Sequence, residues 1–214
     1  MPGARRLGLR IGILGGAFNP PHLGHLILAQ EAYTHLGLDR VVFMPYAEPS
    51  HRTLEDDPGA DVRLTMCEHA VSADARFAVS ALEVERGGPA YTVETLRELR
   101  SRAGDDELFL LLGGDQAASL GSWQEPEEVL SLAVVAVAER DEWRRGSIMD
   151  RLHGFDAAER VRFFEMPRVD ISSSLIRARA RAGKPIRYLV PDKVANYVGA
   201  QSLYGASVPA GATR

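Results

Sequence analysis

Two histidines three residues apart, His22 and His25, are the side chains near the start of the chain best suited to chemistry. They follow Gly15-Gly16, and a glycine pair lets the backbone turn sharply and lets a ligand approach the main chain. Residues 9–14 form an apolar run of strand type, and the apolar residues after the turn recur at helical spacing. Both histidines therefore project from one face of a helix's first turn. Because the N–H groups and dipole of a helix start attract anions, the pattern indicates phosphate chemistry.

Each of these features has an ordinary explanation when it is taken alone. Many strands are followed by a glycine turn, and a histidine pair at this spacing is usually solvated or hydrogen-bonded. Their combination at one helix start favours a binding site. No metal site is predicted, because H-E-x-x-H is absent and the single cysteine, Cys67, rules out a thiolate cluster. Cys67 is interpreted as a small packed residue.

A second candidate anion site lies late in the chain, where residues 171–177 read I-S-S-S-L-I-R. Serines at a helix start supply a cap and leave N–H groups exposed to a ligand. Arg177, one turn further on, can reach back over that end to hold a phosphate. Three serines before a helix often do no more than cap it, but the first motif favours the phosphate interpretation here.

The composition is that of a globular protein with a sizeable core. The 214 residues are 45% hydrophobic and 25% charged, which suits one α/β domain. A formal net charge of −4 argues against a nucleic-acid-binding surface. One cysteine excludes an internal disulfide and makes a reducing cytoplasm the default. The N-terminus lacks a signal peptide's apolar segment, and the longest apolar run, residues 132–138, is far below the roughly 20 residues of a membrane helix.

Strand and helix patterns alternate along the chain, which predicts an α/β fold with a doubly wound, Rossmann-like parallel sheet and a small helical C-terminal part. Strands are expected at residues 9–14, 40–45, 77–84, 107–112, 132–138 and 161–166, and helices at residues 60–72, 92–102, 172–182 and 191–199. In such sheets ligands bind beyond the carboxyl ends of the strands, so the turns at Gly15, Gly113 and Ser172 are expected to meet.

No linker divides the chain, so residues 1–201 are expected to form a single domain and residues 202–214 a frayed tail. Residues 46–59, rich in proline, serine and acidic residues, are interpreted as a long loop of functional importance or disorder. Residues 139–160 are polar and helix-prone.

Missing patterns exclude several kinds of chemistry. The P-loop pattern is absent and the only lysines are Lys184 and Lys193, so a P-loop kinase is excluded. The absence of G-x-G-x-x-G argues against a dinucleotide-dependent dehydrogenase, and the absence of G-x-S-x-G argues against a serine hydrolase.

The first motif, G-G-x-F-x-P-x-H-x-G-H at residues 15–25, resembles the signature of the nucleotidyltransferase superfamily with an H-x-G-H motif. Those enzymes transfer an adenylyl or cytidylyl group from a nucleoside triphosphate to a phosphate. The element at residues 171–177 is similar to the one that follows the last strand in the same superfamily.

Three further blocks narrow the resemblance to the nicotinate-mononucleotide adenylyltransferases of bacterial NAD synthesis. Residues 83–96 fit E-x-x-R-x-G-P-x-Y-T-x-x-T-L, residues 112–123 look like L-G-x-D…L…W, and residues 188–197 look like Y-L-V-P-x-x-V-x-x-Y. The matches follow the family's order over roughly residues 9–200. The chain departs from the family pattern at three places. Asn19 stands where an acidic residue is common, although asparagine also occurs there. Arg52 stands where the family usually has lysine, and residues 139–141 lack the usual Arg-Pro-Gly.

The resemblance implies an adenylyl transfer. The phosphate of nicotinate mononucleotide attacks the α-phosphorus of ATP in line, giving nicotinate adenine dinucleotide and pyrophosphate. This nucleophile is already an anion, so positioning and charge stabilisation suffice without a general base. The implied catalytic residues are His22, His25 and Arg177. Mg²⁺ is expected to be carried by the ATP phosphates, with no metal ligand from the protein.

The resemblance also implies residues for each substrate. The expected ATP-binding residues are Gly15, Gly16, Ala17, Phe18, His22, His25, Gly113, Asp115, Ile171, Ser172, Ser173 and Arg177. The expected residues for nicotinate mononucleotide are Asn19, His51, Arg52, Tyr91, Thr92, Trp123 and Gln124. The indole of Trp123 offers a face for the pyridine ring, although a half-buried packing role explains it as well.

Other functions stay open at this point. The acceptor can instead be nicotinamide mononucleotide or phosphopantetheine, although phosphopantetheine adenylyltransferases lack the tyrosine-threonine and tryptophan blocks. A nucleotide-binding domain without catalysis is a third possibility, against which the intact His22, His25 and Arg177 argue. The expected partners are small-molecule substrates, neither nucleic acid nor membrane, in the cytoplasm. The sequence leaves monomer or homo-oligomer undecided.

Overall fold

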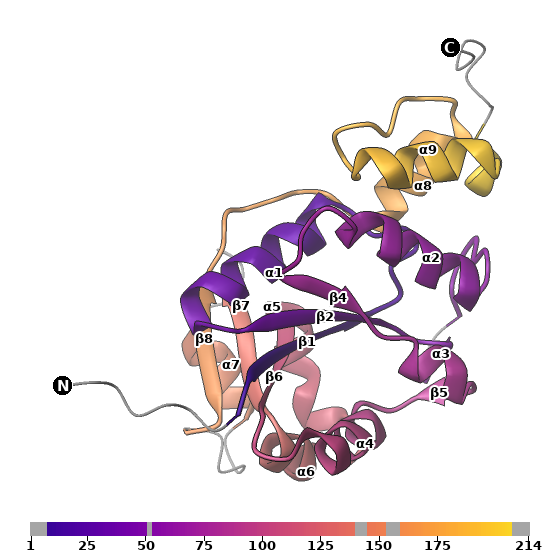
Figure 1. The fold of residues 1–214 in the computed structure, drawn as a ribbon. Coiled ribbons are helices and arrows are strands. Elements are labelled where there is room, and N and C mark those ends of the chain that lie inside the picture. The colour runs from indigo at the N-terminus through magenta and orange to yellow at the C-terminus, as the bar shows by residue number, and fades with distance from the viewer. Residues whose placement is uncertain (1–7, 51–52, 140–144, 153–158, 207–214) are drawn as a thin grey trace.

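The structure is a computed structural model that describes residues 8–50, 53–139, 145–152 and 159–206. Strands and helices alternate along the chain (Figure 1). The strands are β1 (Arg10–Gly16), β2 (Arg40–Pro45), β3 (Glu48–Pro49), β4 (Phe77–Val79), β5 (Pro89–Ala90), β6 (Glu107–Gly113), β7 (Val134–Glu139) and β8 (Val161–Glu165). The helices are α1 (Leu23–Leu36), α2 (Ala60–Val71), α3 (Leu82–Arg86), α4 (Thr92–Ala103), α5 (Gly114–Ser119), α6 (Pro126–Leu132), α7 (Arg145–Arg151), α8 (Ser173–Arg181) and α9 (Asp192–Ala200), with the 3-10 turns η1 (Leu120–Ser122) and η2 (Leu203–Gly205).

Six parallel strands form the main sheet in the order β4-β2-β1-β6-β7-β8, while β3 and β5 pair separately. The chain begins in the middle of this sheet, adds strands on one side, and then crosses to the other side. The predicted doubly wound fold is confirmed. The order reverses between β1 and β6, and such a reversal leaves a crevice beyond the carboxyl ends of the two central strands. These strands end at Gly16 and Gly113, so the crevice opens at the two glycine turns.

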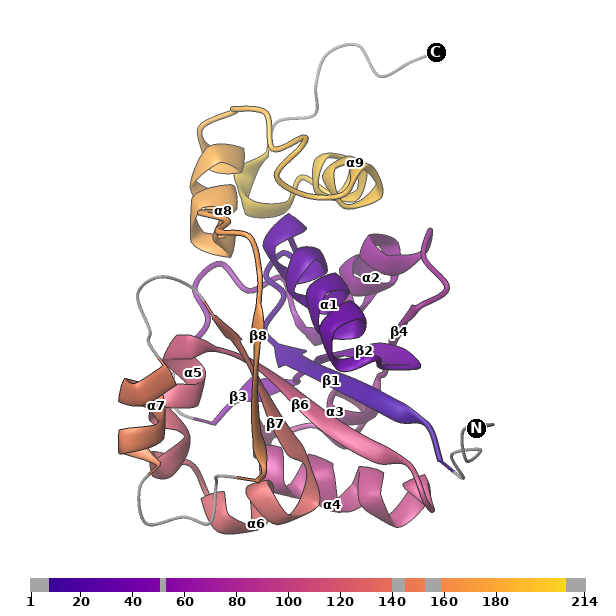
Figure 2. The same cartoon turned by 90° about the vertical axis from the view of Figure 1, so that its left-hand side faces the viewer.

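The strand β6 shows how an apolar run builds a core on both faces of the sheet. Successive side chains of a strand point to opposite faces. Phe109 and Leu111 pack in the cluster that contains α1 and α2 side chains, whereas Leu108, Leu110 and Leu112 pack in the cluster with α4, α5 and α6. Figure 2 shows α1 and α2 on one side of the sheet and α4 to α7 on the other. A strand buried on both faces is typical of parallel sheets.

The helices α8 and α9 form the small C-terminal part, which lies beside α1 and α2 (Figures 1 and 2). Ile176 of α8 and Val194 of α9 are fully buried in one cluster with Met66 of α2. The hydroxyl of Ser173 donates a 2.8 Å hydrogen bond to the carbonyl of Pro20, which ties the start of α8 to the segment before α1. This packing places the motif at residues 171–177 beside the crevice.

Two boundaries differ from the sequence expectation. Residues 77–84 were expected to form one strand, but β4 ends at Val79 and α3 begins at Leu82. The hydroxyl of Ser80 accepts the N–H of Leu82 over 3.3 Å, and local side-chain bonds of this kind end a strand ladder. Similarly, Leu132 closes the helix α6, which Pro126 opens at a position where proline favours a helix start. The strand β7 therefore begins later than expected, at Val134.

The tail was expected to fray from Ser202, but the described structure continues to Ala206. The turn η2 places Tyr204 in the cluster of α8 and α9, where only 9% of its surface is exposed. An aromatic ring that packs against two helices holds this segment in place. Among the described residues, no helix has the length and apolar character needed to cross a membrane.

Candidate functional site

Two cavities adjoin at the carboxyl ends of β1 and β6, at the reversal of strand order. The first has a volume of about 760 Å³ and the second about 520 Å³. Gly15, Gly16, Tyr46 and Gln116 line both, so the two meet at the end of β1. We call them the first cavity, which holds the histidines, and the second cavity, which holds Trp123.

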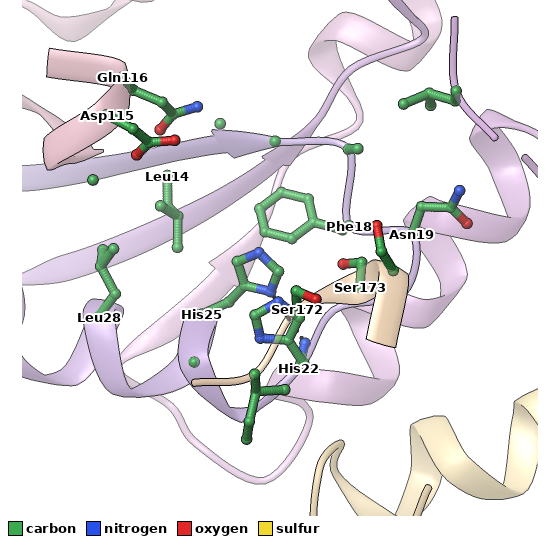
Figure 3. Close-up of a pocket in the computed structure, with 18 of the residues that line it drawn as sticks. Leu14, Phe18, Asn19, His22, His25, Leu28, Asp115, Gln116, Ser172 and Ser173 are labelled. Carbon is green, nitrogen blue, oxygen red and sulfur yellow. Dashed lines mark hydrogen bonds between the residues drawn. The ribbon is translucent and has the colours of Figure 1, made fainter. Parts of the chain in front are cut away.

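The first cavity brings together every residue that the sequence assigned to ATP. They come from the glycine turn, the start of α1, the turn after β6 and the start of α8, so the prediction that these turns meet is confirmed. Figure 3 shows Asp115 at one end of this cavity and Ser172 and Ser173 toward the other, with the imidazoles between. The residues are Gly15, Gly16, Ala17, Phe18, His22, His25, Gly113, Asp115, Ile171, Ser172, Ser173 and Arg177.

The two imidazoles are held by the start of α1, where His22 is the N-cap and His25 the third helical residue. The backbone N–H of His22 donates a 3.1 Å hydrogen bond to Nδ1 of His25, and the rings stack with centroids 3.7 Å apart. A ring nitrogen that accepts carries no proton, so neutral His25 bears its proton on Nε2. The hydrogen bond to Nδ1 therefore leaves Nε2 of His25 as the N–H donor.

The ring of Phe18 packs against the ring of His25. Phe18 is buried, has φ of +50° in the left-handed region, and contacts the His25 ring edge-on at 5.0 Å between centroids. A Cβ at Gly16 would lie 3.3 Å from Cζ of this ring, whereas a Cβ at Gly15 would meet nothing within 4 Å. A side chain at Gly16 would therefore require the Phe18 ring to shift by a few tenths of an ångström.

Arg177 lies between the first motif and the loop before α2. Only 8% of its surface is exposed, and Nη1 donates a 3.0 Å hydrogen bond to the carbonyl of Asn19. Carboxylate oxygens of Glu55 and Asp56 lie 3.5 Å from the guanidinium. Arg181 pairs with Asp56 as well, and this contact lowers the pKa of that carboxyl. The guanidinium of Arg177 is thus paired with two carboxylates at the edge of a cavity suited to anions.

Ser172 and Ser173 have structural contacts besides lining the first cavity. Ser172 caps α8, because its hydroxyl accepts the N–H of Leu175 over 3.1 Å. Ser173 bonds to Pro20 as described above. The ordinary explanation of serines as a helix cap therefore holds for Ser172, and it is compatible with a place in the cavity wall.

Arg63 is a residue that sequence reasoning missed. It is fully buried in α2, and its guanidinium donates to the carbonyls of Ala17 at 3.0 Å, Tyr46 at 2.7 Å and Ala47 at 2.7 Å. Its Nε donates to Asp57 at 2.9 Å. A buried cation with this many partners joins the glycine turn to the loop after β2 and sets the wall of the first cavity. No spacing pattern marks it, because all its partners are distant carbonyls or lie in a loop.

The second cavity gathers four of the residues expected to bind nicotinate mononucleotide, namely Tyr91, Thr92, Trp123 and Gln124. His51 and Arg52 lie outside the described residues. Asn19 was expected with this group, but the structure places it in the wall of the first cavity, 2% exposed. Its Nδ2 donates to the carbonyl of Glu55 at 3.0 Å and its Oδ1 accepts from Tyr204, so its amide is occupied by the fold.

Trp123 combines the two roles that the sequence left open. It is half-buried, packs against the core cluster beneath α4 and α6, and also lines the second cavity. Its indole N–H donates a 3.2 Å hydrogen bond to the hydroxyl of Ser119. The ring is therefore fixed in orientation at the cavity wall.

Glu83 is a buried carboxyl in the wall of the second cavity, a role that the sequence motif did not reveal. The hydroxyl of Thr95 donates to it, and Arg86 donates to Thr95 at 2.8 Å. Burial raises the pKa of the Glu83 carboxyl. The hydrogen bond from Thr95 and the charge of Arg86 lower this pKa, but the effect of burial is larger. This network holds α3 against the start of α4, where Tyr91 and Thr92 reach the cavity.

The described residues contain no group of three histidine, cysteine, aspartate or glutamate side chains placed to hold a metal ion. The first cavity offers imidazole, guanidinium, hydroxyl and main-chain donors around space for an anion. The second cavity is lined by aromatic, hydroxyl and amide side chains together with the carboxyl of Glu83.

Comparisons of sequence give consistent results. A model of the cytidylyltransferase-like family matches residues 13–179. A probable nicotinate-nucleotide adenylyltransferase of Corynebacterium kroppenstedtii is 40% identical over 205 residues, covering 95% of this chain and 95% of that protein. A protein of the same name from Geobacillus thermodenitrificans is 39% identical over 197 residues, covering 92% of this chain and 87% of that protein.

Comparisons of structure agree in fold. The nicotinic acid mononucleotide adenylyltransferase of Plasmodium falciparum complexed with NaAD has a TM-score of 0.76 at 17% identity, covering 94% of this chain and 99% of that chain. A putative nicotinate-nucleotide adenylyltransferase of Vibrio parahaemolyticus has a TM-score of 0.67 at 17% identity, covering 94% of this chain and 98% of that chain. At these identities the likeness concerns the fold alone.

Proposed function

The chain belongs to the nicotinate-nucleotide adenylyltransferase family, within the cytidylyltransferase-like group, and we propose on that premise that it transfers the adenylyl group of ATP to nicotinate mononucleotide. The products are nicotinate adenine dinucleotide and pyrophosphate, so the step belongs to NAD biosynthesis. The observation that carries this proposal is the pair of adjoining cavities, which offers separate space for a donor and an acceptor beside one glycine turn.

ATP, with Mg²⁺ on its phosphates, is proposed to occupy the first cavity. The start of α1 points its N–H groups and dipole at the phosphates. His22 and His25 contact the phosphoryl oxygens, with Nε2 of His25 as the donor nearest the α-phosphorus. Ser172, Ser173 and Arg177 hold the β- and γ-phosphates at the start of α8. Gly113 and Asp115 lie against the ribose.

Nicotinate mononucleotide is proposed to occupy the second cavity. The pyridine ring stacks on Trp123, and Tyr91, Thr92 and Gln124 surround the rest of the nicotinate end. At Gly15 and Gly16 no side chain stands between the cavities, so the acceptor phosphate can approach the α-phosphorus from the second cavity. We further propose that His51 and Arg52 contact nicotinate mononucleotide.

The reaction needs no general base from the protein, because the attacking phosphate oxygen is already anionic. Holding both groups in an in-line arrangement removes much of the entropic barrier, and donors aimed at the phosphoryl oxygens stabilise the charge that develops there. The residues that contact the phosphates are suited to this role because imidazole and guanidinium donate to anionic oxygens.

We also propose that the sheet and its helical C-terminal part work as one nucleotidyltransferase domain in the cytoplasm. Cys67 is a buried free cysteine, and burial raises its pKa, which fits a structural residue.

A panel of acceptors tests the proposed function. Pyrophosphate release from ATP is measured with nicotinate mononucleotide, nicotinamide mononucleotide and phosphopantetheine, and the dinucleotide product is identified by its mass. We expect the highest kcat/KM with nicotinate mononucleotide. A preference for phosphopantetheine would overturn the assignment, and ATP binding without turnover on any acceptor would favour the non-catalytic alternative.

A further inference from the structure

The helix α5 runs along the line where the two cavities meet. Its buried face consists of Gly114, Ala117 and Ala118, whose small side chains let it pack closely on the sheet. Its other face carries Asp115, Gln116 and Ser119, all of them exposed. The 3.6-residue period of a helix puts these three on one side, toward the cavities.

These three residues divide between the cavities in order along the helix. Asp115 lines the first cavity but not the second, Ser119 lines the second but not the first, and Gln116 lines both. Figure 3 shows Asp115 and Gln116 extending from the start of α5 near the end of β1. Gln116 therefore lies where the occupants of the two cavities must approach each other.

The side chain of Gln116 has no role in holding the fold. Its amide makes no hydrogen bond with the described residues, and only its main-chain carbonyl is used, by the hydroxyl of Ser119 at 2.9 Å. Ser119 differs in this respect, because its hydroxyl also accepts from Trp123 at 3.2 Å. An amide with unused donors at the junction of the two cavities is available for ligands.

We infer that Gln116 is a further catalytic residue that contacts both substrates, an inference that rests on the proposed function. A glutamine amide offers two N–H donors and one carbonyl acceptor without a charge. The acceptor phosphate and the α-phosphate of ATP repel each other as they approach, and one amide that donates to both offsets this repulsion at the reacting atoms. Gln116 exchanges no proton. The acceptor oxygen bonds to the α-phosphorus, and the bond from that phosphorus to the β-phosphate oxygen breaks with its electron pair leaving on pyrophosphate.

Tyr46 is the other side chain common to both cavities, but it is also part of the fold. Its carbonyl accepts from Arg63 at 2.7 Å, and the Arg63 guanidinium lies 5.5 Å from its ring centroid. Because the Tyr46 ring lies against the Arg63 guanidinium, a change of this side chain would alter the cavity wall together with any contact to substrate. A change at Gln116 tests the contact alone.

The test uses Gln116→Ala and Gln116→Glu, with Gln124→Ala as the matched control. Gln124 is an exposed glutamine that lines only the second cavity. A hydrogen bond to a charged group is worth enough that its loss lowers kcat by about 10- to 150-fold in Gln116→Ala. Gln116→Glu adds a negative charge between two anions and should lose more. Gln124→Ala should raise the KM of the acceptor alone.

Direct binding separates this role from a structural one. Nicotinate adenine dinucleotide spans both cavities, so its Kd, measured by calorimetry, should rise in both Gln116 variants while the thermal midpoint stays within about 2 °C of wild type, because no fold contact is lost. A kcat and a dinucleotide Kd within twofold of wild type for Gln116→Ala would overturn the inference. So would a change confined to the KM of one substrate. Inactivity of the wild type with ATP and nicotinate mononucleotide would instead count against the proposed function.

Discussion

The hydroxyl of Tyr204 donates a 2.7 Å hydrogen bond to Oδ1 of Asn19 and so joins two residues 185 positions apart in the chain. Burial raises the pKa of this hydroxyl, which keeps it protonated as a donor. Asn19 in turn donates to the carbonyl of Glu55 and accepts from Arg177 at its own carbonyl. The C-terminal segment, the loop before α2 and α8 therefore all meet at one residue in the wall of the first cavity.

Replacing Tyr204 by phenylalanine leaves the buried Oδ1 of Asn19 without its donor. We expect a loss of about 1–3 kcal/mol in the free energy of unfolding, measured by urea denaturation. Tyr197→Phe, in the neighbouring helix α9, is the control and should change stability by less than about 0.5 kcal/mol. A chain ending at Gln201 should lose more stability, relative to a chain ending at Ala206, than Tyr204→Phe loses relative to the wild type. Equal stability of the two shortened chains would contradict a structural role for this segment.

Replacing His25 by alanine should remove the N–H donor nearest the transferring phosphoryl group. The loss of one such donor lowers kcat on the order of 100- to 1000-fold. His35→Ala changes an exposed histidine on the same helix and should leave turnover unaltered. Both variants are measured by pyrophosphate release, with circular dichroism to establish that they fold. Wild-type turnover in a folded His25→Ala protein would remove His25 from the catalytic residues.

Replacing Glu55 by glutamine should strengthen the binding of ATP. Glu55 is 85% exposed in its side chain and lies 3.5 Å from Arg177, where it competes with the phosphates proposed to bind there. An exposed ion pair is worth about 0.2–1 kcal/mol, so the KM for ATP should fall by about 1.4- to 5-fold at low salt. The effect should vanish at high salt because screening weakens the competing pair. Glu48→Gln, on β3 outside both cavities, is the control; an equal change in it would refute the competition.

Replacing Trp123 by alanine should weaken the use of nicotinate mononucleotide far more than the use of ATP. Stacking of a flat base on an aromatic ring is worth about 1–3 kcal/mol, which corresponds to about a 5- to 150-fold loss in acceptor affinity. If Trp123 instead serves the core, stability should fall by about 3–5 kcal/mol and both substrates should be affected together. Both Michaelis constants and the thermal midpoint are measured, with Tyr188→Ala as an exposed aromatic control.

Replacing Glu83 by glutamine should change how stability depends on pH. Burial raises the pKa of Glu83, so the folded state binds its proton more tightly than the unfolded state does. The stability that this proton contributes is complete below the usual pKa of a glutamate and is lost as the pH rises through the raised pKa. Relative to Glu83→Gln, the wild type should therefore become less stable as the pH rises from about 4, with no further change above the raised pKa. Urea denaturation at a series of pH values measures this difference, and a constant difference would contradict a raised pKa.

The alternation of strands and helices and the place of the site followed from local patterns in the sequence. The fully apolar residues 108–112 indicated a strand buried on both faces, and the glycine turns at Gly15 and Gly113 marked the carboxyl ends of central strands. Burial decides the spacing of apolar residues, and a glycine turn after a strand marks its carboxyl end, so both signals are local. Ligands bind beyond these ends in a doubly wound sheet. The family motifs then supplied the residues of the first cavity.

The tertiary structure alone decided which polar groups serve the fold and which face the cavities. Arg63 bonds to three carbonyls, the amide of Asn19 turns to Glu55 and Tyr204, and Arg177 pairs with Glu55 and Asp56. Each of these partners is a main-chain carbonyl or a side chain without helical or strand spacing to its partner, so no periodicity could reveal it. The division of the face of α5 between two cavities likewise depends on how α5 packs on the sheet. Local sequence fixes periodic elements because burial is periodic, whereas contacts between elements depend on their packing in three dimensions.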